Sequence, residues 1–258
     1  EKADPTIAAG RLHDTIEDGY IFVFSDAHYW PGEATTAHRG MIALIKELKP
    51  KIVVCNGDAF DGASISRHPR IGWDSAPSVT EELEAVRVRL AEIEKAAKGA
   101  SLYWPIGNHD ARFETYLADK APQFEGVAGF ALKDHFPAWT PCMSVWINGD
   151  LVIKHRLGGG ANAASTNART SGKSMVTGHL HSLKVSPITD YNGTRFGVDT
   201  GTLARPYGQQ FLYTEDNPVD WRAGFAVFKF IDGKMMWPQV AAVREEGVME
   251  YCGKIYNV

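Results

Sequence analysis

Short apolar runs alternate with amphipathic stretches over the first 107 residues. The runs "YIFVFS" (20–25), "KIVVC" (51–55) and "SLYWPIG" (101–107) are typical of buried strands. Between them, 35–50 and 79–99 repeat apolar residues every three or four positions, which predicts two helices, with Thr80 as the N-cap of the second. Strands that alternate with helices predict βαβ units and a parallel sheet.

The second half of the chain is strand-rich and poor in helix signals. Turn residues between alternating segments predict three hairpins, at Asn148–Gly149, Asn192–Gly193 and Asp232–Gly233. This change of pattern favours a mixed sheet, or two sheets face to face with helices outside. We find no repeat or linker, so we expect one domain over 1–258.

Two irregular excursions interrupt this pattern, at about 62–78 and 156–173. The second is rich in Gly, Ala, Ser and Asn and lies between two polar segments. We interpret it either as a flexible surface loop or as a lid over a site, since long loops at sites are often functional.

The amino-acid composition allows many classes of globular protein. Hydrophobic residues make up 44% of the 258 positions and charged residues 22%, which are ordinary values for a globular protein with a substantial core. With 27 basic against 31 acidic residues, the net charge of -4 gives no overall attraction to nucleic acid or anionic membranes, although a local basic patch is allowed. Three scattered cysteines and the lack of a long apolar run favour a cytoplasmic protein with no membrane partner. The oligomeric state is left open.

Polar residues follow each apparent strand. The segments are "DAH" (26–28), "GD" (57–58), "GNHD" (107–110), "KHR" (154–156) and "GHLH" (178–181). Ligands bind where the carboxyl ends of parallel strands meet, so we expect these segments to lie together. If each is extended, residues two apart point to the same side. Asp26 with His28, and His179 with His181, then each present two donors to one point.

The donor types indicate a transition metal. Mixed carboxylate and imidazole ligands suit manganese, iron, zinc, cobalt or nickel better than calcium or magnesium. There are more such donors than one ion needs, and the Asp58 carboxylate can bridge two ions. Two ions that share a bridge are the simplest interpretation.

This order of motifs resembles the calcineurin-like metallophosphoesterase family. The family pattern is D-x-H, GD-x-x-D, GNH[D/E], a lone His and GH-x-H, and it is found here between residues 26 and 181. The resemblance implies an α/β fold: a four-layer αββα sandwich with two mixed β-sheets face to face, flanked by helices. It also implies a dinuclear metal centre.

The resemblance also assigns roles to individual residues. One ion would be held by Asp26, His28, Asp58 and His181, and the other by Asp58, Asn108, His155 and His179. His109 would protonate the leaving group, Asp110 would orient His109, and Asp61 would give a supporting hydrogen bond. Arg156 follows His155 at a position where the family commonly has Gly.

The implied activity is phosphoric ester hydrolysis. Two divalent ions would supply a bridging hydroxide that attacks phosphorus. We expect manganese ions, with iron, zinc, nickel or cobalt as alternatives. We favour phosphodiester bonds, in nucleotides or nucleic acid, because His109 can protonate a poor alkoxide leaving group. A phosphomonoesterase acting on proteins or small molecules is the alternative, and an inactive binding module of the same fold is a third.

The sequence indicates residues that contact the substrate less clearly than it indicates metal ligands. Arg156, His68 and Arg67 are the candidates. The arginines Arg156, Arg67, Arg70 and Arg169, with Lys173, could form a basic rim. The aromatic-rich stretch 205–225 could either border a cleft or cover the edge of a sheet.

Overall fold

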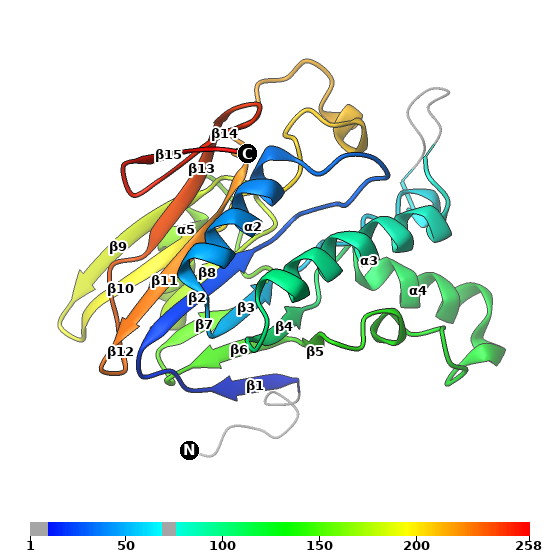
Figure 1. Ribbon diagram of the computed structural model, residues 1–258. Helices are drawn as coiled ribbons and strands as arrows, with labels where there is room; N and C mark the ends of the chain where they lie inside the picture. The colour runs from blue at the N-terminus through cyan, green and yellow to red at the C-terminus, as the bar shows by residue number, and fades with distance from the viewer. Residues whose placement is uncertain (1–9, 69–75) are drawn as a thin grey trace.

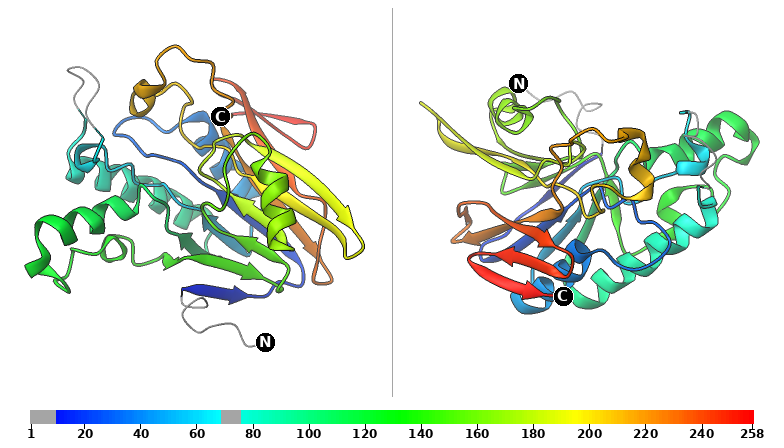
Figure 2. Two further views of the ribbon diagram at one scale, coloured as in Figure 1. Left: turned by 180° about the vertical axis from the view of Figure 1, so that it is seen from behind. Right: turned by 90° about the horizontal axis from the view of Figure 1, so that it is seen from above.

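The computed structural model describes residues 10–68 and 76–258. Arg70 and the middle of the 62–78 excursion lie outside the described residues. Two mixed sheets pack face to face, and helices cover both outer faces (Figures 1 and 2). The predicted α/β sandwich is confirmed. No helix in the described part of the chain is both long and apolar enough to cross a membrane.

The larger sheet contains the predicted βαβ units. Its parallel strands are β2 (Gly19–Phe24), β3 (Ile52–Cys55), β4 (Ser101–Pro105) and β5 (Thr140–Cys142). Helix α2 (Thr36–Leu48) joins β2 to β3, and α3 (Val79–Ala96) joins β3 to β4. The strand order is β15-β14-β13-β11-β2-β3-β4-β5, with β12 on β11. The antiparallel strands are β11 (Gly224–Ile231), β12 (Lys234–Met235), β13 (Gln239–Glu245), β14 (Val248–Tyr251) and β15 (Lys254–Asn257).

The second sheet has six strands in the order β1-β6-β7-β8-β10-β9. The three predicted hairpins are confirmed as β6–β7, β9–β10 and β11–β12. The strands of this sheet are β1 (Arg11–Asp14), β6 (Ser144–Ile147), β7 (Leu151–Ile153), β8 (Ser174–Thr177), β9 (Lys184–Asp190) and β10 (Gly193–Asp199).

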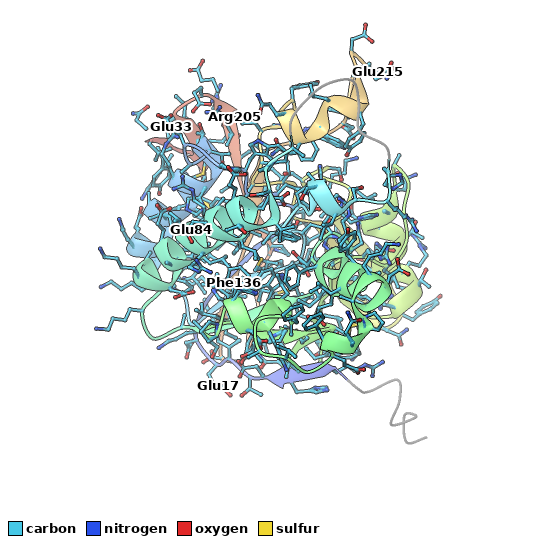
Figure 3. The ribbon with its side chains drawn as sticks, turned by 90° about the vertical axis from the view of Figure 1, so that its right-hand side faces the viewer. Glu17, Glu33, Glu84, Phe136, Arg205 and Glu215 are labelled. Atoms are coloured by element: carbon cyan, nitrogen blue, oxygen red, sulfur yellow. The ribbon has the colours of Figure 1, made fainter. Side chains whose placement is uncertain are left out.

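The apolar run of β2 is explained by two cores. Ile21 and Val23 face the second sheet, whereas Phe22 and Phe24 face α2 and α3 on the outer side. A strand buried on both faces needs apolar residues at every position. In Figure 3, Phe136 is labelled in the outer core, where its ring centroid lies 5.2 Å from that of Trp104.

One local expectation was wrong. Helix α3 begins at Val79, within the predicted range, but its N-cap is Ser78 rather than Thr80. Ser78 Oγ accepts from the Glu81 backbone N at 3.3 Å, and the Glu81 carboxylate accepts from Ser78 N at 2.8 Å. This reciprocal pair satisfies two free backbone donors, an option that Thr80 does not have.

Half of the 156–173 excursion is helical. Helix α5 (Ala163–Ser171) packs on the outer face of the six-stranded sheet, with Ala164 and Ala168 buried. A Cβ at Gly197 on β10 would collide with the backbone oxygen of Ala164, so helix and strand approach closely because their side chains are small. The loop and lid interpretations therefore apply at most to 156–162. The remaining helical elements are α4 (Ala111–Lys120), η1 (Ala63–Ile65), η2 (Pro122–Phe124), η3 (Leu132–His135) and η4 (Gln209–Thr214).

Candidate metal centre

Strand ends from both sheets meet at one site. Asp26 and His28 follow β2, Asp58 follows β3 and Asn108 follows β4, all in the larger sheet. His155 follows β7, and His179 and His181 follow β8, in the smaller sheet. The site therefore lies where the two sheets bring their carboxyl ends together.

Potential ligand atoms gather in three groups, of which His28, Asp61 and His109 form one that shares His28 with the first of the other two. Asp26, His28 and His181 form the first of these two, and Asp58, His155 and His179 form the second; within each, the ligand atoms lie within 4.8 Å of one another. The residues of these two groups are buried except His179, which is partly exposed. Asn108 Oδ1 lies 3.2 Å from His155 Nε2, which places the amide with the second group.

The backbone at these residues is not extended, contrary to the expectation for D-x-H and H-x-H. Five of the candidate ligands have positive φ: Asp26 (51°), His28 (38°), Asp58 (55°), His179 (71°) and His181 (58°). Such conformations cost about 1 kcal/mol or more per residue and cluster at functional sites. The chain turns sharply after each strand, and the side chains are directed by these turns rather than by a pleat.

Hydrogen bonds between segments hold these turns. Asp26 N donates to Gly57 O and His28 N donates to Asp58 O, both at 2.9 Å. His179 N donates to Asp26 Oδ2 at 2.8 Å, and Thr202 Oγ1 donates to Asp26 O at 2.6 Å.

Two glycines permit this close approach. A Cβ on Gly178 would lie 2.6 Å from Asp26 Oδ2, and one on Gly107 would collide with Asp58 Oδ1. Side chains at these positions would displace the carboxylates of Asp26 and Asp58, one from each group. The glycines of "GNHD" and "GHLH" are thus explained by crowding around Asp58 and Asp26.

The donor atoms have room for cations. His28 Nδ1 lies 2.7 Å from Asp61 Oδ1, which leaves Nε2 to face the first group. His28 Nε2 is buried without a hydrogen-bond partner among the described residues, whereas His181 faces the first group through Nε2, 3.1 Å from Asp26 Oδ1. A buried polar atom without a partner costs about 1–3 kcal/mol, which a bound cation would remove. A metal ligand His commonly uses its other nitrogen on a carboxylate or carbonyl, as His28 does.

His155 is held in the same manner, although Arg156 replaces the Gly that commonly follows it. Its Nδ1 lies 2.8 Å from the carbonyl oxygen of Asn56, and its Nε2 lies 3.1 Å from Asp58 Oδ2. Burial lowers the pKa of His155, but the Asp58 charge outweighs it and raises the pKa to about 10. Burial likewise raises the pKa of Asp58, yet His155 lowers it well below its usual range. The group thus needs positive charge to compensate its carboxylate.

His109 lies beside the centre, half-buried, with its ring centroid 4.6 Å from that of His28. Asp61 Oδ1 lies 2.9 Å from His109 Nδ1, so Asp61 orients both histidines. Burial lowers the pKa of His109, but the Asp61 hydrogen bond and the Asp58 charge raise it overall.

Asp110 does not have the position expected from the sequence. Its carboxylate accepts from Asp58 N at 2.8 Å, Gly107 N at 2.9 Å and Trp104 Nε1 at 2.9 Å, all on Oδ2, while Oδ1 accepts from Phe60 N at 3.0 Å. Asp110 therefore fixes the backbone that carries Asp58, and the orienting contact to His109 is made by Asp61 instead. Burial raises the pKa of Asp110 to about 6.

Sequence reasoning missed Arg112. One guanidinium nitrogen donates to the Asp61 carbonyl at 2.8 Å, and another lies 3.2 Å from His109 Nε2. Arg112 lies in the first turn of α4, where the helix dipole disfavours a cation. Its place three residues after His109, on one face of a helix, was the available signal.

The predicted substrate residues lie on the surface, and Arg156 directly follows the candidate ligand His155. Arg67, His68 and Arg156 are exposed, and their substrate role stays a prediction. The 205–225 stretch borders the centre. Phe211 in η4 lies with its ring centroid 5.1 Å from that of His28 and 5.4 Å from that of His181.

Comparison with known families gives the assignment. A family model described as calcineurin-like phosphoesterase matches residues 19–183, which include every candidate ligand. The chain belongs to the calcineurin-like phosphoesterase family. No curated protein matches it.

Solved structures also match this chain, at low identity. Vps29 from Chaetomium thermophilum is 10% identical, with a TM-score of 0.49 and coverage of 93% of this chain and 98% of that chain. A dimetal phosphatase from Danio rerio is 10% identical, with a TM-score of 0.45 and coverage of 94% and 98%. The E. coli phosphoesterase Yfce is 18% identical, with a TM-score of 0.38 and coverage of 85% and 97%. At these values the matches carry no argument about activity.

Proposed function

We propose that this chain is a hydrolase of phosphoric esters that works with two divalent ions and acts on phosphodiester bonds. Membership of the calcineurin-like phosphoesterase family supports the reaction class. The observation that carries the proposal is the pair of buried ligand groups beside His109, with His28 Nε2, a buried nitrogen without a hydrogen-bond partner among the described residues, facing the first group.

The ligand sets follow from the two groups. Asp26, His28 and His181 would hold one ion, and Asn108, His155 and His179 the other, with Asp58 shared. Two bound divalent ions, for which manganese is the first candidate, would neutralise phosphoryl oxygens and make hydroxide available near neutral pH. Asp61 and Asn56 fix which nitrogen of His28 and His155 faces the ions, because each accepts a hydrogen bond at the opposite Nδ1.

His109 is the proposed general acid. Its Nδ1 is held by Asp61, so Nε2 would be the nitrogen that donates to the leaving oxygen once Arg112, 3.2 Å away, contacts the phosphoryl group instead. Arg112 is proposed to bind a phosphoryl oxygen beside His109 through its guanidinium, which reaches within 3.2 Å of Nε2. A proton supplied at this point matters most for an alkoxide leaving group, which supports phosphodiesters, including those of nucleotides or nucleic acid.

A phosphomonoesterase is the second candidate. Arg112 adds a positive charge next to the position proposed for the phosphoryl group, and a monoester carries more negative charge than a diester. The same residues would then act on protein or small-molecule monoesters.

Hydrolysis of p-nitrophenyl phosphate and of bis-p-nitrophenyl phosphate tests both candidates. The protein is stripped of metal, assayed, and assayed again after Mn²⁺ is restored. We expect no turnover in the stripped protein and restored turnover with the bis ester preferred. Asp58→Asn should abolish turnover, whereas Asp134→Asn, at a distant surface position, should leave it unchanged. Failure to hydrolyse either ester with any of Mn²⁺, Fe²⁺, Zn²⁺, Ni²⁺ or Co²⁺ would overturn the proposal.

A further inference from the structure

Three aromatic side chains line one side of the metal centre: Phe211 and Tyr213 in η4 and Trp221 beyond it, here termed the aromatic wall. The Trp221 ring centroid lies 4.6 Å from that of His181, and the Phe211 centroid lies 5.1 Å from that of His28. Phe211 and Trp221 contact each other at 5.1 Å, and Tyr213 lies 6.4 Å from Trp221. The wall therefore lies directly against the imidazoles of the first ligand group.

Hydrogen bonds attach the wall to the centre. Arg222 N donates to the His181 carbonyl at 2.7 Å, and Thr202 N donates to the Arg222 carbonyl at 3.1 Å. Gln210 Nε2 donates to the His28 carbonyl at 3.4 Å. The segment projects from the end of the molecule where Glu215 is labelled in Figure 3, and it is drawn in yellow to orange in Figure 1.

The three rings differ in exposure. Phe211 is only 2% exposed and serves as apolar cover for His28 and His181. Tyr213 is 56% exposed, and Trp221 is half-buried. Cover alone does not account for Tyr213, because more than half of its surface remains in solvent. An exposed ring fixed next to a reaction centre is available to a ligand.

The wall also lies near the proposed acid. The His28 ring contacts both Phe211 and the His109 ring, so a single imidazole separates the wall from His109. The leaving group of an ester must pass next to the acid that protonates its oxygen. Its remaining atoms would therefore extend along the wall.

We propose that Tyr213 and Trp221 form a subsite that stacks a flat aromatic group on the leaving side of the substrate phosphate. The subsite rests on the proposed function and narrows its substrate class to aryl esters or nucleotides. Aromatic faces stack on planar π systems with little dependence on their hydrogen-bonding groups. Aryl esters and nucleotides both contain a planar ring, and binding experiments distinguish between these two substrate classes.

Calorimetric titration of Mn²⁺-loaded protein with phosphonates tests the subsite without turnover, because the P–C bond is not hydrolysed. Phenylphosphonate is compared with methylphosphonate for aryl esters. For nucleotides, the methylene phosphonate analogue of adenosine monophosphate is compared with that of ribose 5-phosphate. Stacking of one ring predicts tighter binding of the aromatic member of at least one pair by about 5- to 100-fold.

Substitutions of Tyr213 and Trp221 test whether these two rings cause the tighter binding of the aromatic ligand. Tyr213→Leu and Trp221→Leu should each reduce that ratio several-fold, whereas Tyr213→Phe and Trp221→Phe should retain it because they keep a ring. Tyr207→Leu is the matched control, since Tyr207 is 70% exposed in the same stretch and makes no ring contact with the wall among the described residues. Bound Mn²⁺ is measured in every variant, so that a loss of metal is not mistaken for a loss of stacking.

Each outcome decides the proposal. Tighter binding of phenylphosphonate than of methylphosphonate would assign aryl esters as the substrate class. Tighter binding of the adenosine analogue than of the ribose analogue would assign nucleotides. Equal binding within both pairs, or a preference that survives both leucine variants, would overturn the subsite. An intact preference in a protein that hydrolyses no ester would instead reject the proposed function and leave the subsite standing.

Discussion

Asp61 accepts a hydrogen bond from His109, with Asp61 Oδ1 2.9 Å from His109 Nδ1. Because the same oxygen lies 2.7 Å from His28 Nδ1, one carboxylate orients both the proposed acid and a proposed ligand. Asp61→Asn should lower kcat by about 100-fold at saturating Mn²⁺, through loss of acid orientation. It should also weaken Mn²⁺ binding by about 10- to 100-fold.

Titration of activity against Mn²⁺ separates these two effects of Asp61. Loss of acid orientation lowers the activity reached at saturating Mn²⁺. Weaker Mn²⁺ binding raises the Mn²⁺ concentration at half-maximal activity. A variant with a normal plateau would show that Asp61 does not orient the acid. Asp119→Asn, an exposed carboxylate on α4, is the control.

His109→Asn should retain both ions and lose turnover by about 100- to 10,000-fold. The loss should be larger for esters that release an alkoxide, such as dimethyl phosphate, than for esters that release p-nitrophenolate, because a good leaving group needs less help from an acid. Rates measured over a series of leaving groups, with metal content measured in parallel, check this. An equal loss for all leaving groups would contradict the acid role.

Arg112→Ala should weaken inhibition by inorganic phosphate by about tenfold and lower kcat/KM, because it removes a charged donor next to His109. Arg112→Lys should recover only part of the loss, since a lysine cannot make both guanidinium contacts. Arg87→Ala on the exposed face of α3 is the control. Unchanged phosphate inhibition in Arg112→Ala would rule out the contact.

Glu82 should make stability depend on pH. Its carboxylate is buried and accepts from Gly62 N at 2.6 Å and Ala63 N at 3.0 Å. Burial, followed by the Asp61 charge, raises its pKa from 4.5 to about 7. The folded protein thus holds this proton more tightly than the unfolded chain, so the contribution is fully present below about pH 4.5 and is lost as pH rises to about 7.

Urea unfolding in a chelator at pH 4.5 and pH 7.5 measures that contribution. Relative to Glu82→Gln, the wild-type free energy of unfolding should fall by roughly 1–3 kcal/mol between the two pH values. A difference that stays constant, or rises with pH, would contradict the shift of the Glu82 pKa.

Much of the fold and of the centre was predictable from the sequence. Apolar runs ending in polar residues identified β2, β3 and β4, and turn residues identified the hairpins. Asp26, His28 and Asp58 could be found because strand ends in a parallel sheet converge, whatever the details of the loops.

The remaining features depend on tertiary contacts that local patterns do not encode. Asp61 rather than Asp110 reaches His109 because the loop after β3 folds back toward α4. Helix α5 was missed because its small residues resemble a loop and are helical through packing on Gly197. The positive φ angles at the ligands arise from hydrogen bonds between segments, which no spacing reveals.

The number of bound metal ions tests the central claim most directly. Metal-stripped protein is titrated with Mn²⁺, and bound ions per chain are counted by native mass spectrometry and by electron paramagnetic resonance. We predict two ions in the wild type, spin-coupled through Asp58, and loss of the coupled signal in Asp58→Asn. A single ion in the wild type, or two ions without coupling that Asp58→Asn leaves unchanged, would contradict the shared centre.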